Sequence, residues 1–202
     1  MPHILIADDH AIARRGLKEI ICDAIPLADV DTAANAEELL GKVMRGDWDL
    51  VISDINMPGR SGLEMLSEIR KNFPDLPVLI VSVHSEEEYA IRVIKAGGAG
   101  FINKDDAVEE ELAKAVNIIL SGKKYITSSV AEKLANELAK GENKKPHELL
   151  SNREFHIFKL LAKGTGTREI ADKLSLSVNT VGTYRSRILA KMNFKSTADI
   201  IR

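Results

Sequence analysis

Short aliphatic runs recur in the first half of the chain, and each is followed by a longer segment with helical spacing. The runs are Ile4 to Ala7, Leu50 to Ser53, Val78 to Val83 and Phe101-Ile102, with Val30 to Ala33 as a weaker strand candidate. Continuous apolar runs are typical of strands covered on both faces, and parallel strands need crossover helices between them. The pattern therefore predicts a five-stranded parallel α/β sheet, for which we expect the order 2-1-3-4-5 with the weaker strand at an edge.

Helix start signals accompany this alternation. The capping signals are Asn35 with Glu38, Ser61 with Glu64, and Ser85 with Glu88. Each places a short polar side chain three residues before an acidic one, as in the capping box. The last helix of the domain is predicted from Glu109 to Ser121, so the domain should span residues 1–122.

A second, helical domain is predicted after a polar connection. Residues 123–147 are interpreted as a linker, because helical spacing over 128–140 is followed by the stretch Gly141 to Pro146, which contains both Gly and Pro. Residues 148–202 should then form a small all-α domain. Its predicted helices start with caps at Ser151 and Thr167, continue with a longest helix over 177–192, and end with one that begins at Ser196.

Charge separates the same two parts of the chain. Residues 1–146 carry a formal balance of −7, whereas residues 147–202 carry +5. A small basic module is expected to bind a polyanion.

Composition also indicates the cellular compartment of the protein. The single cysteine, Cys22, excludes an internal disulfide and favours a reducing environment. The first residues lack a basic segment followed by a long apolar one, and no apolar run approaches the length that spans a bilayer. We therefore expect a cytoplasmic protein with no membrane partner.

Polar residues follow the apolar runs where a parallel sheet binds its ligands. Asp8 and Asp9 follow the first run, Asp54 the third, Ser82 the fourth and Lys104 the fifth. Each residue alone is compatible with a solvated turn or a helix cap. Together, three close carboxylates need a cation, and oxygen-only ligation suits Mg²⁺. The lysine and the hydroxyl would then meet the oxygens of a phosphoryl group attacked by a carboxylate.

These segments resemble the receiver domain of two-component response regulators, which has a flavodoxin-like fold. The matching segments are Ile6-Ala7-Asp8-Asp9-His10, Asp54 to Gly59, Val81-Ser82 and Gly100 to Lys104. The resemblance implies that Asp54 accepts the phosphoryl group. It implies that Mg²⁺ is bound by Asp9 and Asp54 directly, by Asp8 through water and by the Asn56 carbonyl.

The same resemblance implies that Ser82 and Phe101 form the switch pair and that Lys104 is the receiver lysine. The chain departs from many receivers in two ways: the aromatic residue lacks a phenolic hydroxyl, and Asp105 stands where proline is common. His84, two residues beyond Ser82, is interpreted as an exposed loop imidazole.

The C-terminal segment resembles the LuxR-type helix-turn-helix of NarL/FixJ-class regulators. On a helix begun at Val178, one side turns to the core and the opposite face is polar. A recognition helix lays such a face in the major groove, and its basic residues contact phosphates. The expected DNA-binding residues are Asn179, Thr180, Gly182, Thr183, Arg185, Ser186, Arg187 and Lys191. A helical bundle that binds protein is the alternative.

Together these features predict a DNA-binding transcriptional regulator, not an enzyme. A sensor histidine kinase would phosphorylate it, and activation would produce a homodimer on double-stranded DNA. A haloacid-dehalogenase-like phosphatase would want a second aspartate where the chain has Asn56, and a flavodoxin-like carrier would not place Asp8 and Asp9 beside a cofactor phosphate. A DNA binder with an inert receiver is disfavoured by the complete acidic set.

Overall fold

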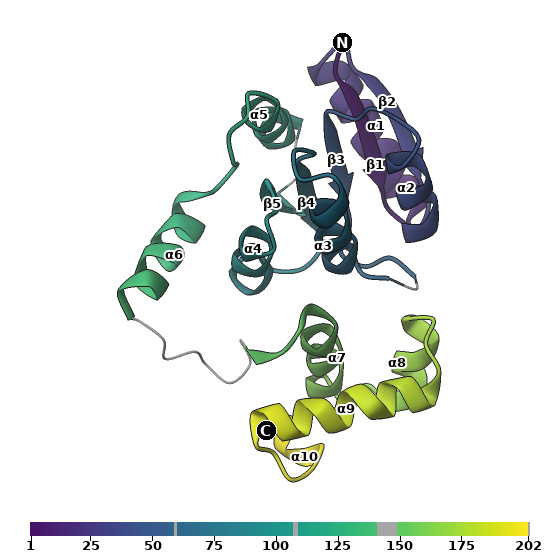
Figure 1. The fold of residues 1–202 in the computed structure, drawn as a ribbon, viewed down its shortest axis with the longest axis vertical. Helices are drawn as coiled ribbons and strands as arrows, with labels where there is room; N and C mark the ends of the chain where they lie inside the picture. Colours follow the sequence, from purple (N-terminus) through teal and green to yellow (C-terminus); the bar gives the residue numbers. More distant parts are fainter. Residues whose placement is uncertain (59, 107–108, 141–148, 202) are drawn as a thin grey trace. The chain divides into compact units, whose positions relative to one another are not determined.

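The computed structural model describes residues 1–58, 60–106, 109–140 and 149–201. The chain divides into two compact units, Met1–Ala139 and Lys140–Arg202 (Figure 1). None of the helices in these described ranges is long and apolar enough to cross a membrane.

The first unit is built on a parallel sheet. Its strands are β1 (His3–Ala7), β2 (Asp29–Ala33), β3 (Leu50–Ser53), β4 (Val78–Ser82) and β5 (Gly100–Asn103). The strand order is β2-β1-β3-β4-β5, which confirms the predicted sheet and places β2 at an edge. Every residue of β3 and β4 is buried, which explains why their sequences are apolar without alternation.

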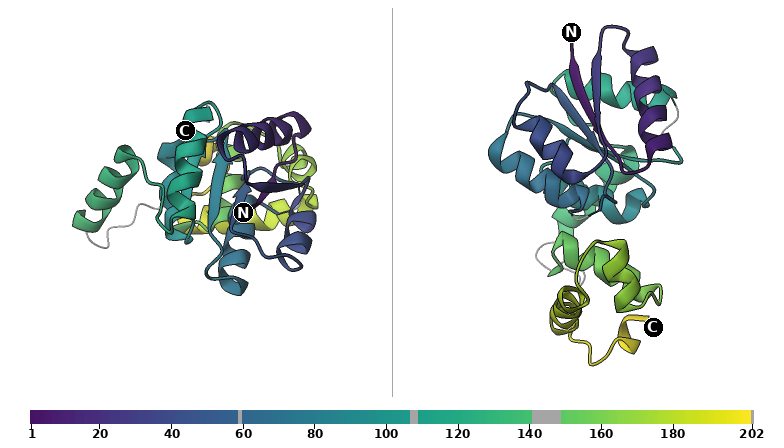
Figure 2. Two further views of the ribbon diagram at one scale, coloured as in Figure 1. Left: turned by 90° about the horizontal axis from the view of Figure 1, so that it is seen from above. Right: turned by 90° about the vertical axis from the view of Figure 1, so that its right-hand side faces the viewer.

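Helices cover both faces of this sheet (Figures 1 and 2). The covering helices are α1 (Ala11–Ala24), α2 (Ala36–Val43), α3 (Gly62–Asn72), α4 (Glu86–Lys95) and α5 (Glu109–Leu120). The next helix along the chain is α6 (Ser128–Lys140). Leu17 and Ile21 of α1 share one core with Leu112 and Val116 of α5, on the sheet face formed by alternate strand residues such as Ile4. The structure thus has the layered arrangement expected of an α/β domain.

Capping follows the sequence signals at α2 and α3. Asn35 caps α2, and Ser61 forms a complete capping box with Glu64 at α3. Ser85 occupies the N-cap of α4, but its side chain makes no capping hydrogen bond.

The first unit continues past residue 122, where the sequence analysis ended the domain. Tyr125 is 6% exposed and packs into the α1 and α5 core. Its segment forms a parallel bridge with Gly100 at the free edge of β5. The residues just after α5 therefore complete the sheet, and the predicted connection from Gly141 to Pro146 lies outside the described residues.

The second unit contains only helices in its described residues. They are α7 (Asn152–Ala162), α8 (Thr167–Lys173), α9 (Val178–Met192) and α10 (Ala198–Ile201). Both α7 and α8 pack against α9, whose buried residues are Val181 and Ile188. The capping box of Ser151 is confirmed, but the cap predicted at Thr167 is wrong, because Gly166 occupies the N-cap of α8 and Thr167 is its first helical residue.

Candidate functional site

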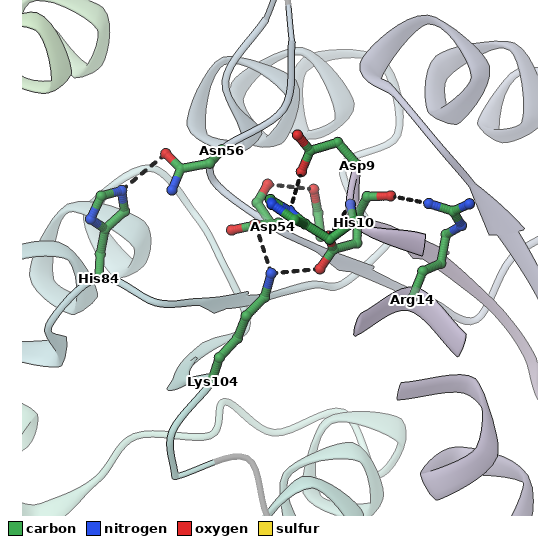
Figure 3. Close-up of polar contacts among 9 residues, drawn as sticks. Asp9, His10, Arg14, Asp54, Asn56, His84 and Lys104 are labelled. Carbon is green, nitrogen blue, oxygen red and sulfur yellow. Dashed lines mark hydrogen bonds and ion pairs between the residues drawn. The ribbon is translucent and has the colours of Figure 1, made fainter. Parts of the chain in front are cut away.

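Lys104 joins two buried carboxylates at the carboxyl end of the sheet. Its Nζ lies 2.6 Å from Oδ2 of Asp8 and 2.7 Å from Oδ2 of Asp54 (Figure 3). Asp8 and Asp54 are 0% and 3% exposed and follow β1 and β3, which pair side by side. Burial lowers the pKa of the Lys104 ammonium, but the hydrogen bonds and charges of the two carboxylates outweigh it and raise this pKa above its usual value.

Asp9 and His10 extend the carboxylate cluster. Nδ1 of His10 lies 2.9 Å from Oδ1 of Asp9, and one ligand atom from each of Asp8, Asp9, His10 and Asp54 lies within 4.8 Å of the others (Figure 3). Oδ1 of Asp54 is buried and accepts no hydrogen bond from the described residues. A buried carboxylate oxygen without a donor, surrounded by other carboxylates, fits a divalent cation such as Mg²⁺.

Ser82 supplies a buried hydroxyl at the same edge of the sheet. The residue ends β4 and is 0% exposed, and its Oγ has no hydrogen-bond partner among the described residues. The Lys104 N–H donates to the Ser82 carbonyl over 2.8 Å, so the ends of β4 and β5 are held together. Phe101, in the middle of β5, is 3% exposed. The structure therefore brings the predicted hydroxyl and lysine to one side of Asp54.

The loop after Lys104 uses a donor that proline does not have. The Asp105 N–H donates to Oδ1 of Asn103 over 2.8 Å, and the Asp106 N–H donates to the Asn103 carbonyl over 3.0 Å. Proline lacks a backbone N–H. The departure from the receiver pattern at Asp105 is thus matched by a local hydrogen bond.

The prediction that His84 is an exposed loop imidazole is wrong. Its side chain is half-buried, and Nε2 lies 3.0 Å from Oδ1 of Asn56 (Figure 3). The ring stacks on buried Tyr89 with centroids 4.4 Å apart, and the Asn103 amide donates to the His84 carbonyl over 3.1 Å. The imidazole is therefore fixed beside Asn56, which follows Asp54 and lies 28 residues earlier in the chain than His84.

Gly62 is a site residue that the sequence analysis missed. A Cβ at this first residue of α3 would lie 2.0 Å from the carbonyl oxygen of Asp54. The Gly62 N–H also donates to the Ile55 carbonyl over 2.9 Å. Only glycine allows this approach without displacing the backbone of Asp54. The sequence offered only a glycine after a cap residue as a signal.

A separate polar surface lies on α9. Ser177 caps the helix by accepting the Thr180 N–H over 3.0 Å. The hydroxyl of Thr183 donates to the Asn179 carbonyl over 3.0 Å, and that of Ser186 donates to the Gly182 carbonyl over 3.1 Å. Of the residues expected to contact DNA, the exposed ones are Asn179, Thr183, Arg185, Ser186, Arg187 and Lys191, whereas Thr180 and Gly182 are half-buried.

Lys191 differs from the other basic residues of α9. Its Nζ lies 2.6 Å from Oε2 of Glu154, whose side chain is 4% exposed. Burial raises the pKa of this carboxyl, but the hydrogen bond from Lys191 and those from Ser151 outweigh burial and lower it. The ammonium therefore has an internal partner, which the sequence analysis did not foresee.

Two family models match the chain in the same two parts. The response regulator receiver domain matches residues 4–117, and the luxR family of bacterial regulatory proteins matches residues 148–202. The Oxygen regulatory protein NreC of Staphylococcus carnosus is 38% identical over 205 residues, which cover 98% of this chain and 94% of that protein. The NreC protein of Staphylococcus epidermidis is 36% identical over 206 residues with the same coverage.

Solved structures share the fold. A LuxR-family response regulator from Aurantimonas sp. is 29% identical with a TM-score of 0.61, covering 68% of this chain and 97% of that chain. RcsB of Salmonella enterica bound to the rprA promoter is 22% identical with a TM-score of 0.67, covering 99% and 96%.

A buried acidic cluster on a parallel sheet of this order, joined in sequence to a helix-turn-helix, defines the class of response regulators. The chain belongs to the NarL/FixJ class of this family, whose members regulate transcription in response to phosphorylation.

Proposed function

We propose that Asp54 is the phosphoacceptor through which a sensor histidine kinase controls DNA binding by this chain. The observation that carries the proposal is the environment of the Asp54 carboxylate. Lys104 binds Oδ2, whereas Oδ1 is buried without a hydrogen-bond partner among the described residues. One oxygen of the carboxylate is thus held in place by the lysine, and no described donor blocks the other, which leaves the carboxylate able to react as a nucleophile.

The residues around Asp54 suit a phosphoryl group with its cation. Asp9 and Asp54 would hold Mg²⁺ directly, Asp8 through water and Asn56 through its backbone carbonyl. Bound there, Mg²⁺ supplies the positive charge that lets an anionic phosphoryl group approach carboxylates. The Ser82 hydroxyl and the Lys104 ammonium would each contact one phosphoryl oxygen.

In the proposed transfer, one carboxylate oxygen of Asp54 forms a bond to phosphorus as the bond from phosphorus to the donor's imidazole nitrogen breaks. The imidazole leaves with the electron pair of that bond and is then protonated. The chain is therefore proposed to be an acceptor of the phosphoryl group and not an enzyme that converts a separate substrate. Asn56 cannot act as the acid or base that a phosphatase of the haloacid-dehalogenase type would need.

The second unit is proposed to bind double-stranded DNA through the exposed face of α9. Asn179, Thr183 and Ser186 would face base edges, because they are exposed and lie opposite buried Val181 and Ile188. Half-buried Thr180 and Gly182 would line the sides of the same face. Arg185, Arg187 and Lys191 would lie near phosphates, although Lys191 is already paired with Glu154.

Activation is proposed to produce a homodimer in the cytoplasm. A single recognition helix reads too few base pairs to be selective against a genome, so two modules on a repeated site are needed. RcsB, a regulator of the same fold, has been solved as two dimers bound to two parallel DNAs, which supports this arrangement by analogy.

Labelling with acetyl phosphate tests the phosphoacceptor. We expect one phosphoryl group per chain, located at Asp54 by mass spectrometry, in the presence of Mg²⁺. Labelling should disappear in Asp54→Asn and in excess EDTA, whereas Asp49→Asn, which changes an aspartate before β3, should label normally. Undiminished labelling of Asp54→Asn would overturn the assignment.

A further inference from the structure

The chain after α5 runs along the open edge of the sheet before it enters α6. We define the strap as residues 124–127. The Tyr125 N–H donates to the Ala99 carbonyl over 2.8 Å, and Tyr125 pairs with Gly100 in a parallel bridge. A Cβ on Gly100 would lie 2.9 Å from the Tyr125 carbonyl oxygen, so the strap needs glycine in β5.

Tyr125 anchors the strap from the side of α5. Its ring is buried in the core, and its hydroxyl donates to the carboxylate of Glu111 in the first turn of α5. Its bridge partner Gly100 directly precedes Phe101 in the sequence. The strap therefore contacts the strand that carries one member of the switch pair.

Thr127 ties the other end of the strap to α4. Its hydroxyl donates to Oε1 of Glu86, the first residue of α4, over 2.7 Å. The same hydroxyl accepts the Val130 N–H over 3.4 Å, and the Thr127 carbonyl accepts the Ala131 N–H over 2.9 Å. Thr127 is thus the N-cap of α6, so one side chain connects α4 with the helix that leads toward the second unit.

The contact with Glu86 lies close to the phosphoryl site in the sequence. Only Val83, His84 and Ser85 separate Glu86 from Ser82, whose buried hydroxyl has no hydrogen-bond partner among the described residues. His84 is held by Asn56 and Tyr89, so this three-residue loop has little conformational freedom. A shift of Ser82 toward a phosphoryl oxygen should therefore displace the start of α4, where Glu86 lies.

We propose that the strap couples phosphorylation to α6: a phosphoryl group at Asp54 draws Ser82, moves Glu86 away from Thr127 and loosens the first turn of α6. This inference rests on the proposed phosphorylation of Asp54. The Tyr125 bridge holds the strap to β5 in both states, so the change is confined to the Thr127 end. The strap thereby converts a movement of one hydroxyl into a change in the helix that precedes the DNA-binding module.

Hydrogen exchange on the full chain tests this coupling. With acetyl phosphate and Mg²⁺, the amides of Val130 and Ala131 should exchange about fivefold faster, which corresponds to the loss of one hydrogen bond. The Tyr125 amide should keep its protection. Glu86→Ala should show the faster exchange in both states, whereas Glu109→Ala, which removes an exposed carboxylate from the first turn of α5, should behave like the unchanged chain.

Substitutions that change the charge at residues 127 and 86 distinguish the contact with Glu86 from the capping of α6. Thr127→Asp keeps a side chain that can cap α6 but repels Glu86, so it should accelerate exchange without phosphorylation. Adding Glu86→Lys should restore slow exchange in the unphosphorylated chain. Equal protection of Val130 and Ala131 in both states, with Asp54 fully labelled, would overturn the coupling and leave the phosphoacceptor assignment intact. Absence of label at Asp54 would instead overturn the proposed function.

Discussion

Nζ of Lys191, near the end of α9, lies 2.6 Å from Oε2 of Glu154 in the first turn of α7. The same oxygen accepts the Ser151 N–H over 2.7 Å, which closes the capping box of α7. One carboxylate therefore caps one helix and binds the last turn of another. A lysine that the sequence placed near DNA phosphates joins two helices of its own domain.

Replacing Lys191 should reduce stability more than DNA binding. Lys191→Met leaves the buried Glu154 carboxylate without its cation, and because Lys191 is partly exposed we expect a loss of about 1–3 kcal/mol. Urea unfolding followed by the amide NMR signals of α7 and α9 measures this loss, with exposed Lys195→Met as the control. Unchanged stability with a weaker salt dependence of DNA binding would show that Lys191 contacts phosphate instead.

The same pair predicts an acid dependence. The pKa of Glu154 is lower in the folded chain than its usual value near 4.3, so the unfolded chain binds more protons in that range. The stabilisation is present above about pH 4.3 and should be lost as the pH falls through the lowered folded value. Urea unfolding between about pH 3 and pH 7 should show this loss, and Glu154→Gln should flatten it. An identical pH profile in that variant would contradict the pairing.

Lys104 should stabilise the acidic cluster when no cation is present. Its pKa is raised, so it stays charged through neutral pH, and Lys104→Met leaves Asp8 and Asp54 to repel each other. We expect a loss of about 2–4 kcal/mol in EDTA and a smaller loss in excess Mg²⁺. Thermal unfolding in both buffers measures it, with exposed Lys124→Met as the control. A loss of the same size in both buffers would mean that cation and ammonium do not compensate the same charges.

Removing the Ser82 hydroxyl should separate phosphorylation from its consequence. Ser82→Ala should still bind Mg²⁺ and label at Asp54, because the hydroxyl is not a metal ligand, but phosphorylation should raise DNA affinity far less than in the unchanged chain. A duplex selected from a random pool by the phosphorylated protein serves as the probe. Ser85→Ala, which removes a hydroxyl that makes no capping bond, is the matched control. A normal response in Ser82→Ala would refute the switch role.

Two substitutions on α9 should affect DNA binding differently. Thr183→Ala should change which sequences are preferred, since this exposed residue lies on the polar face. Arg187→Ala should weaken binding to all sequences and reduce the slope of affinity against salt by about one. Titrations on selected and scrambled duplexes at several salt concentrations distinguish the two. Equal loss on both duplexes for Thr183→Ala would mean that another face enters the groove.

Much of the fold followed from local patterns. The apolar runs predicted the five strands, because residues buried on both faces must all be apolar. The residues after those runs predicted the cluster of Asp8, Asp54 and Lys104, because the carboxyl ends of parallel strands meet at one edge. The pairing of Tyr125 with the edge of β5, beyond the predicted boundary at 122, was not predicted, since a short polar stretch gives no sign of it.

The sequence by itself determined which residues lie in strands and helices and which polar side chains reach the end of the sheet, because periodicity and chain direction fix these. The tertiary structure decided the partners: His84 with Asn56, Lys191 with Glu154 and Thr127 with Glu86. These residues are 28, 37 and 41 positions apart. A pattern along the chain assigns a side chain to a face, but a hydrogen bond also requires two distant segments to be packed at a defined separation.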